Sequence, residues 1–530
     1  MSDLENEIKR RLTFAIISHP DAGKTTITEK LLLFGGAIHM AGAVKSNKNA
    51  RSTVSDFMAM ERERGISISS SVMGFDYKNR KINLLDTPGH ADFSEDTYRV
   101  LTAVDSTLMV IDSVKGVEER TRKLCEICRM RSTPILTFLN KMDREGKEPI
   151  ELLDEVEKEL AIQVRPMTWP VGQGQAFKGV YHLLEKTLYL FRPGQTDTEA
   201  ISIDGVNDPR LDQEVGNHLA QKLREETALI TEVYPPFQLD EYLEGTITPV
   251  FFGSALNNFG VRELLDTLVS LAPCPQPKAA EERTVVPVEP KFSGFIFKIH
   301  ANLDPKHRDR VAYLRICSGR FERNKIYHHV RGNKTFRSAN PTAFMAQNRD
   351  IIDEAFPGDI VGLHDTGTFK IGDTLSEGET LNFKGIPSFA PQIFRTVLNK
   401  DPLKSKQFHK GLDQLAEEGV VQIFSRMYGQ TRILGVVGQL QLEVIKYRLK
   451  EEYNATCDYE AVDFNTASWI TSSDKKVLDE FNSRYAHKVL VDVRGNYVFM
   501  AETIWLLNRM KQDFPSIRFY PTSEMVESRA

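Results

Sequence analysis

The feature that most constrains this chain is a regular alternation of short apolar runs with amphipathic segments over residues 11–140. Four runs of aliphatic and β-branched side chains have the length of buried strands, at residues 12–18, 81–86, 106–112 and 134–140. Three segments with helical spacing separate them, at residues 24–34, 92–104 and 117–131. Strands that are apolar on both faces and alternate with helices predict a doubly wound, mostly parallel sheet covered on both sides.

The rest of the chain changes pattern at two proline-rich boundaries, residues 272–290 and the segment around Pro387 and Pro391. Between them, short alternating strands with turn signals predict an antiparallel barrel. Residues 392–460 then follow the strand-helix-strand-strand-helix-strand order of a ferredoxin-like α+β module, on which residues 461–530 are expected to pack. We therefore predict an α/β domain at 1–275 with an insertion at about 172–247, a linker at 276–290, a β-barrel domain at 291–385 and an α+β domain at 386–530.

Composition excludes several classes of protein. The chain has 530 residues, of which 41% are hydrophobic and 27% charged, so it is neither disordered nor a disulfide scaffold. No run approaches the roughly 18 apolar residues of a membrane span, and the first residues lack the apolar core of a signal peptide. Five cysteines fit a reducing compartment, so we expect a cytoplasmic protein. We also expect a monomer. The net charge of −5 leaves any nucleic-acid contact to a local patch.

The first chemical motif is Ser18-His-Pro-Asp-Ala-Gly-Lys-Thr-Thr26, which follows a predicted strand and opens a predicted helix. The free N–H groups and the dipole of a helix start favour phosphate. Gly23 lets the backbone approach the phosphates, Lys24 supplies positive charge, and the Thr25 hydroxyl can bind Mg²⁺. A Gly-Lys-Thr or Gly-Lys-Ser core alone occurs by chance in about one chain in four of this length. By itself it fits a helix start with a solvated lysine equally well.

Asp86-Thr-Pro-Gly-His90 follows the second predicted strand. This position places a carboxylate beside the phosphate-binding loop, where Asp86 can hold Mg²⁺ through water and the Gly89 N–H can reach a γ-phosphate. An ordinary Pro-Gly turn is the alternative for this segment alone.

Two later motifs predict the identity of the base. In Asn140-Lys-Met-Asp143, the Asp143 carboxylate can accept from guanine N1–H and the 2-amino group, for which adenine has no equivalent pair. In Gly253-Ser-Ala-Leu256, the Ala255 N–H can meet guanine O6. An Asn-Lys-x-Asp match arises by chance in about one chain in fifteen. Four motifs in order, each at the end of a predicted strand, predict a guanine nucleotide site.

A fifth segment, Arg64-Gly-Ile-Ser-Ile68, lies in a polar loop between the first helix and the second predicted strand. The hydroxyl of Ser67 can reach a metal only when the γ-phosphate is present, which is how a nucleotide-sensing switch works. Alone, such a segment is more often a strand edge.

Together these five motifs resemble those of the translational GTPases. SHPDAGKTT, RGISI, DTPGH, NKMD and GSAL stand in that family's order, and the resemblance covers essentially the whole chain. The resemblance implies that the site binds GTP or GDP with Mg²⁺. It also implies that Asp21 contacts the phosphates, the metal or another bound ion. It implies Thr25, Ser67 and Asp86 (through water) at the metal, and His90 as the residue that positions the attacking water. The implied nucleotide-binding residues are Ser18, His19, Pro20, Asp21, Ala22, Gly23, Lys24, Thr25, Thr26, Asp86, Thr87, Pro88, Gly89, His90, Asn140, Lys141, Met142, Asp143, Ser254, Ala255 and Leu256.

The sequence departs from the family pattern at two of these positions. Ser18 replaces the first glycine of the phosphate loop, as the elongation-factor branch tolerates, and Ser67 replaces the usual switch threonine. Ser67 keeps the hydroxyl but lacks the methyl group, so the resemblance implies a less tightly ordered switch.

Two segments narrow the resemblance within this family. Residues 435–454 are similar to the third domain of elongation factor G, but the chain ends at residue 530, too early for the two large domains that follow there. SHPDAGKTT and residues 302–319 instead resemble the class II peptide chain release factors, whose length and three-domain plan also agree. That group implies a ribosome-dependent GTPase that promotes the departure of class I release factors after peptide release. Ribosomal RNA and proteins would be its partners.

Two other functional classes stay open. One is a different translational GTPase, of the translocase or ribosome-rescue kind. The other is a nucleotide-sensing binding module in which hydrolysis is incidental.

Two smaller features each have a structural and a functional interpretation. Between His300 and Arg337 there are ten Lys or Arg against three acids. Such a run is usually a solvated face, although the resemblance slightly favours a footprint for ribosomal RNA. Cys125 and Cys128 form a CxxC pair, but no second pair follows at zinc spacing, so we predict that both pack inside a helix.

Overall fold

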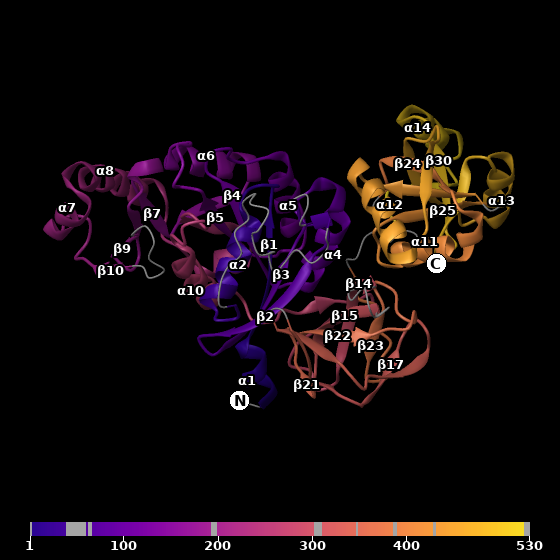
Figure 1. The fold of residues 1–530 in the computed structure, drawn as a ribbon, viewed down its shortest axis with the longest axis horizontal. Helices are drawn as coiled ribbons and strands as arrows, with labels where there is room; N and C mark the ends of the chain where they lie inside the picture. Colours follow the sequence, from indigo (N-terminus) through magenta and orange to yellow (C-terminus); the bar gives the residue numbers. More distant parts are fainter. Residues whose placement is uncertain are drawn as a thin grey trace.

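Figure 1 shows three parts in chain order. An α/β part runs from indigo to magenta, a β part in rose lies below it, and a C-terminal α+β part in orange and yellow lies beside both. The computed structural model describes residues 3–38, 60–61, 66–191, 199–301, 310–345, 348–384, 390–427 and 431–523.

The sheet of the α/β part positions the predicted motifs. Its order is β2-β3-β1-β4-β5-β11-β6, and all its pairings are parallel except that of β2 with β3. The strands are β1 (Arg11–Ser18), β2 (Ser71–Tyr77), β3 (Arg80–Asp86), β4 (Ser106–Asp112), β5 (Ile135–Asn140), β6 (Gln163–Pro166) and β11 (Ile247–Phe252). The helices are α1 (Asp3–Arg10), α2 (Lys24–Phe34), η1 (Ala91–Phe93), α4 (Ser94–Ala103), α5 (Glu119–Met130), α6 (Pro149–Leu160) and α10 (Val261–Leu271). Because parallel strands end at one edge, the segments after β1, β3, β5 and β11 meet there.

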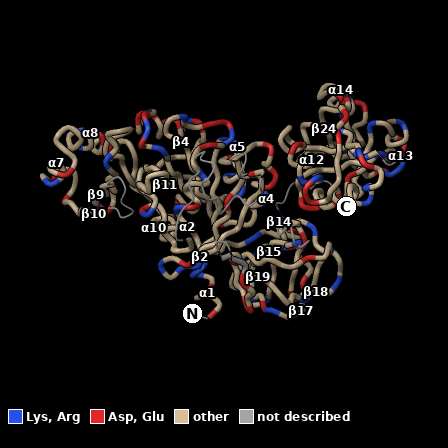
Figure 2. The backbone as a smooth tube through the Cα atoms, viewed as in Figure 1, with Lys and Arg blue, Asp and Glu red and all other residues tan. Residues whose placement is uncertain are grey.

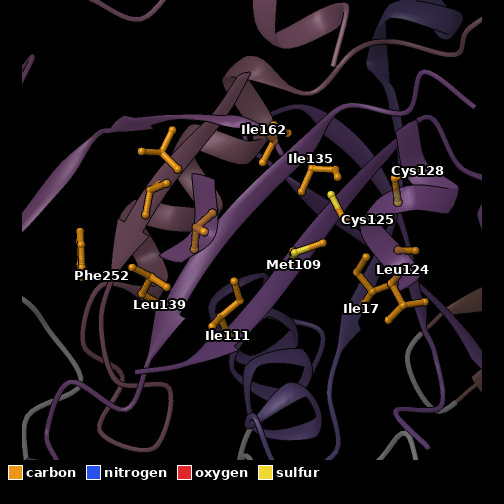
Figure 3. Close-up of a cluster of buried hydrophobic side chains, with 14 of the residues drawn as sticks. Ile17, Met109, Ile111, Leu124, Cys125, Cys128, Ile135, Leu139, Ile162 and Phe252 are labelled. Atoms are coloured by element: carbon orange, nitrogen blue, oxygen red, sulfur yellow. The ribbon is translucent and has the colours of Figure 1, made fainter. Parts of the chain in front are cut away.

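Apolar side chains cover both faces of this sheet, as continuous apolar strands require. One core, part of which is drawn in Figure 3, includes Ile17, Met109, Leu139, Leu124, Cys125 and Cys128. The core on the other face includes Phe14, Ile16, Leu84, Ile27, Leu31 and Leu264. Both α5 cysteines are fully buried, and burial raises the pKa of the Cys128 thiol to about 12. The predicted packing role of the CxxC pair is therefore confirmed.

An additional small sheet of order β10-β9-β8-β7 lies between β6 and β11 in the chain and forms the end of the molecule farthest from the C-terminal part (Figure 1). Its buried Trp169 donates from Nε1 to Glu226 Oε2 at 2.8 Å, which ties the sheet to a long helix. The elements are β7 (Thr168–Val171), η2 (Gly174–Ala176), β8 (Gly179–His182), β9 (Thr187–Leu190), β10 (Glu199–Ser202), α7 (Pro209–Val215), α8 (Asn217–Val233) and α9 (Leu239–Leu243).

The β part is a curled antiparallel sheet that forms a half-barrel. A short hairpin of β12 (Lys278–Ala279) and β13 (Thr284–Val285) precedes it. The strands are β14 (Ser293–Ala301), β15 (Arg310–Ser318), β16 (Phe321–Glu322), β17 (Ile326–His329), β18 (Lys334–Arg337), β19 (Thr342–Met345), β20 (Asn348–Ile351), β21 (Glu354–Ala355), β22 (Ile360–His364) and β23 (Thr374–Ser376). Strand β19 also pairs with β2, so the sheets of the α/β and β parts are continuous.

The C-terminal part begins with the predicted ferredoxin-like order of elements. These are β24 (Ile393–Asn399), η3 (Pro402–Lys404), α11 (Ser405–Glu417), β25 (Gln422–Arg426), β26 (Arg432–Val436), α12 (Gln439–Tyr453) and β27 (Cys457–Ala461). The same order then repeats in β28 (Thr466–Thr471), α13 (Lys475–Arg484), β29 (Val489–Asp492), β30 (Tyr497–Ala501), α14 (Ile504–Asp513) and β31 (Arg518–Tyr520). The two halves share one antiparallel sheet, joined through β25 and β29.

The helix-free faces of these two halves pack on each other. One buried cluster combines Phe394, Phe424 and Ile433 of the first half with Trp469, Leu490, Val498 and Met500 of the second. Helices α11 and α12 cover the outer face of the first half, and α13 and α14 cover that of the second.

The predicted fold class is confirmed in all three parts: a mostly parallel α/β sheet, an antiparallel curled β sheet and a ferredoxin-like α+β module. Figure 2 shows Lys and Arg interspersed with Asp and Glu in each part.

Candidate functional site

The phosphate-binding loop lies between β1 and α2, as predicted. Gly23 stands at the helix start with φ +96°, and a Cβ there would lie 2.3 Å from Asn140 Nδ2. Both the left-handed backbone and the lack of space therefore require glycine. Asn140 Nδ2 donates to the Ala22 carbonyl at 2.8 Å, so the loop is attached to the end of β5.

Lys24 and Asp86 form an ion pair under this loop. Lys24 Nζ lies 2.5 Å from Asp86 Oδ1, and their side chains are 6% and 2% exposed. The pair puts a cation at the start of α2 and a carboxylate at the end of β3. The sequence predicts phosphate and a metal-bound water at this place.

The segment after β3 lies against the phosphate loop. Thr87 Oγ1 donates to the Ile16 carbonyl at 2.7 Å, which fixes the segment to β1. His90 caps the start of η1, and its half-exposed ring lines the same cavity as the phosphate loop.

Asn140 organises the end at which the base is expected. Its Oδ1 accepts from Lys141 N and from Ala255 N, both at 2.9 Å, so it joins the ends of β5 and β11. Lys141 Nζ donates to the Asp21 carbonyl at 2.5 Å and pairs with Asp112 Oδ2 at 2.7 Å. Because the Ala255 N–H donates to Asn140 here, its contact with guanine O6 stays a prediction.

These segments enclose a cavity of about 290 Å³. The predicted residues that line it are Ser18, His19, Pro20, Asp21, Gly23, Lys24, Thr25, Thr26, Ser67, Gly89, His90, Asn140, Lys141, Asp143 and Leu256. Other predicted residues lie beneath or beside that lining, namely Ala22, Asp86, Thr87, Pro88, Met142, Ser254 and Ala255. The cavity is also lined by Ile66, inside the quoted switch segment, and by Arg144, directly after the base motif. Arg64 lies outside the described residues.

His19 joins the phosphate loop to the segment before α5. Its Nε2 lies 3.1 Å from Glu118 Oε1. Burial lowers the pKa of His19, although the Glu118 charge opposes this effect. Sequence reasoning placed His19 at the site but gave no signal for Glu118, since the contact spans about a hundred residues.

Lys298 of β14 connects the β part to the segment after Ser67. Its buried Nζ donates to Ser69 Oγ, Ser70 O and Ser70 Oγ, each at 2.6 Å, and lies 3.3 Å from Asp96 Oδ2. Burial works against the Asp96 carboxylate, but the Lys298 charge and the Ser70 N–H outweigh it, so the pKa of Asp96 is lowered. The alternation of β14 predicts a barrel strand and gives no sign of this contact.

The basic run in the β part is largely paired. Arg310 and Arg315 are buried, and Arg315 pairs with Asp105 of the α/β part at 2.5 Å. The other ion pairs are Arg320–Glu354, Arg323–Asp353, Lys325–Glu377 and Arg331–Asp373. All of these acids lie outside residues 300–337, over which the charge was counted. The structure therefore favours an ion-paired solvated face. Residues 302–309 lie outside the described part.

Comparison with known families agrees with this geometry. The model of the elongation factor Tu GTP-binding domain matches residues 9–274, half of the chain. The model of elongation factor G domain 2 matches residues 291–378. The chain therefore belongs to the translational GTPases with an elongation factor Tu-type GTP-binding domain. Within them it is of the class II release factor RF3 type, because the model of the C-terminal domain of that factor matches residues 383–511.

A solved structure from Thermus thermophilus supports the overall fold. It aligns with 88% of this chain and 71% of its own with a TM-score of 0.69, at 19% sequence identity. This likeness concerns the fold alone. In the described residues, no helix is both long and apolar enough to span a membrane.

Proposed function

We propose that the chain is a ribosome-dependent GTPase of translation termination, which promotes the departure of class I release factors after peptide release. One observation carries this proposal: a pocket built from guanine-nucleotide motifs shares a chain with a C-terminal part that matches the class II release factor family. We also propose that the protein is a cytoplasmic monomer. Its partners would be ribosomal RNA, ribosomal proteins and the class I factors.

The oxygen donors around the phosphate end fit Mg²⁺. Thr25 of α2 and Ser67 of the opposite loop line one cavity, and Asp86 lies beneath it beside Lys24. Hydroxyl, carboxylate, phosphate and water oxygens are the ligands that Mg²⁺ prefers. When bound, the ion would neutralise charge on the phosphate oxygens.

The chain's own residues would then divide the work. The backbone around Gly23 and the Lys24 ammonium hold the phosphates, and Asp143 accepts the guanine donors. His90 aligns the attacking water, and ribosome contact improves that alignment. Activators of other GTPases raise the rate by roughly 10³–10⁵ in this way.

The contact of Lys298 supports a route from nucleotide to ribosome. A change at Ser67 reaches Ser69 and Ser70, and both are hydrogen-bonded to Lys298 of the β part. We infer that GTP favours one arrangement of the parts for ribosome binding, and that hydrolysis releases it.

The test follows a fluorescent class I release factor on ribosomes stalled after peptide release. We expect its dissociation to accelerate only when this protein and GTP are both present. If dissociation is unchanged while the ribosome still stimulates GTP hydrolysis, the termination role is wrong and another translational GTPase role remains. A parallel arm uses a non-hydrolysable GTP analogue. If the analogue fully accelerates dissociation of the class I factor, and this protein then leaves the ribosome, the chain is a nucleotide-sensing module in which hydrolysis is incidental.

A further inference from the structure

The ring of His90 is held on its Nδ1 side by a residue outside the five motifs. Two groups of Asp92 lie 3.3 Å from His90 Nδ1. The backbone N–H donates to this nitrogen when it carries no proton, and the carboxylate Oδ1 accepts from it when it does. Nε2 is therefore the ring nitrogen left for the nucleotide cavity that His90 lines. The partner of one imidazole nitrogen fixes the ring orientation and the role of the other nitrogen.

The second oxygen of the same carboxylate binds the C-terminal part. Asp92 Oδ2 accepts from Leu440 N at 2.8 Å, in the first turn of α12. The N–H groups at a helix start lack partners within the helix, and the dipole there favours a carboxylate. A Cβ on Gly438, just before α12, would lie 2.0 Å from Asp92 Oδ1, so only glycine permits this approach.

An apolar cluster fixes α12 at the same place. Met60, Ile68 and Phe93 of the α/β part are buried against Val444 of α12. Leu440 and Tyr447, also from α12, pack against this cluster. Two polar contacts lie further along, where Gln422 Nε2 donates to Glu95 Oε1 at 2.7 Å and Arg99 Nη1 donates to the Gly419 carbonyl at 3.2 Å. The C-terminal part is therefore docked directly on η1 and α4, next to His90.

We propose that Asp92 is a positioning residue for GTP hydrolysis, which connects the C-terminal part to His90 through a single carboxylate. One oxygen faces the His90 ring and the other binds α12, so a shift of the C-terminal part on the ribosome changes the orientation of that ring. The inference rests on the proposed function in one respect, the role of His90 in aligning water. It adds the element that controls this alignment.

The test measures kcat and KM for ribosome-stimulated GTP hydrolysis by the full chain. Asp92→Ala should lower kcat by about 100-fold, the effect of misplacing a catalytic group by about 1 Å, with little change in KM for GTP. Gly438→Ala should also lower kcat, because its methyl group displaces the Asp92 carboxylate from α12. Gln422→Ala is the matched control: it removes a contact between the same two parts but leaves Asp92 in place, and should keep kcat.

A double-mutant cycle separates positioning from a structural role. If Asp92 acts through His90, adding Asp92→Ala to His90→Ala causes no further loss of kcat. Further loss in that background, or an unchanged kcat in Asp92→Ala alone, overturns the inference. An unchanged kcat in His90→Ala overturns instead the hydrolytic role within the proposed function. If Asp92→Ala fails to fold or to bind GDP normally, Asp92→Asn keeps an acceptor for the Leu440 N–H and replaces it in the cycle, with a smaller loss expected.

Discussion

Lys24 and Asp86 compensate each other's charge in the floor of the nucleotide cavity. A phosphate that binds there takes over part of the Lys24 hydrogen bonding. Lys24 therefore contributes to the binding free energy only the difference between its interaction with phosphate and its interaction with Asp86. Such charge-assisted bonds contribute about 1.5–3 kcal/mol, which corresponds to roughly 10- to 100-fold in affinity.

Lys24→Ala should therefore weaken the binding of both GTP and GDP by roughly 10- to 100-fold, as measured by titration calorimetry. Lys30→Ala is the control, since Lys30 lies on the same helix but does not line the cavity. Normal affinity in Lys24→Ala would contradict the assignment of the phosphate loop.

Asp143→Asn should change the base that the site prefers. The carboxylate is expected to accept from two guanine donors, whereas an asparagine amide can donate to the 2-oxo group of xanthine. Competition between GTP and XTP measures the change. Arg144→Ala alters the same side of the cavity without removing the carboxylate, and should leave the preference for GTP intact. A variant Asp143→Asn that still selects GTP would show that another group reads the base.

Motifs at strand ends could be found in the sequence, because each consists of consecutive residues with strong backbone or charge requirements. They predicted most of the cavity lining. Glu118, Asp92 and Lys298 could not be assigned in the same way. Each acts through a contact to a distant segment, and a carboxylate or lysine in a polar stretch looks the same whether it is solvated or buried.

At the scale of elements, apolar runs predicted the parallel strands, and βαββαβ order predicted the first C-terminal module. Two elements with readable patterns were missed: strand β2, and helix α6, which has a proline in its first turn and apolar residues at helical spacing. The second module was predicted only as a segment that packs on the first. The pairing of β25 with β29 joins segments about 65 residues apart, which no local pattern reveals.

The packing of the two modules on each other leads to a stability prediction. Trp469 lies between them almost completely buried, and its Nε1 donates to Asp492 Oδ2 at 2.9 Å. Trp469→Ala should reduce the free energy of unfolding of the C-terminal part by about 3–5 kcal/mol in urea. Trp505→Ala removes an exposed tryptophan from α14 of the same part and should cost less than about 1 kcal/mol. Equal effects of the two variants would contradict the buried junction.

At the scale of the whole molecule, a buried polar junction joins the α/β and β parts. Their junction contains two ion pairs with side chains at most 5% exposed, Arg11–Asp359 and Arg315–Asp105. Thr13 Oγ1 also donates to the Gly358 carbonyl at 2.7 Å. The C-terminal part contacts both of the other parts, through η1 and α4 next to the nucleotide site and through the Arg310–Glu417 ion pair to the β part.

The pH dependence of unfolding tests this junction. Burial works against the charge of Asp359, but Lys81 and Arg11 outweigh it, so the pKa of Asp359 is lowered from its usual 3.8. A carboxylate with a lowered folded-state pKa contributes stability above its unfolded value of about 3.9, and that contribution is lost as the pH falls through the folded value.

Asp359→Asn should therefore lower the free energy of unfolding of the joined parts at pH 7 by about 3–5 kcal/mol, because Arg11 and Lys81 lose a buried partner. The difference from the unmodified chain should begin to shrink as the pH falls below about 3.9, where the unfolded chain binds a proton at Asp359, and should disappear below the lowered pKa of the folded carboxylate. Urea unfolding at pH 7, 5 and 3.5 measures both effects. Asp458→Asn is the control, since that exposed carboxylate pairs with Lys400 and Lys446 on the surface and should change little. A difference that stays constant across this pH range would mean that Asp359 stabilises the junction by its shape and hydrogen bonds rather than by its charge.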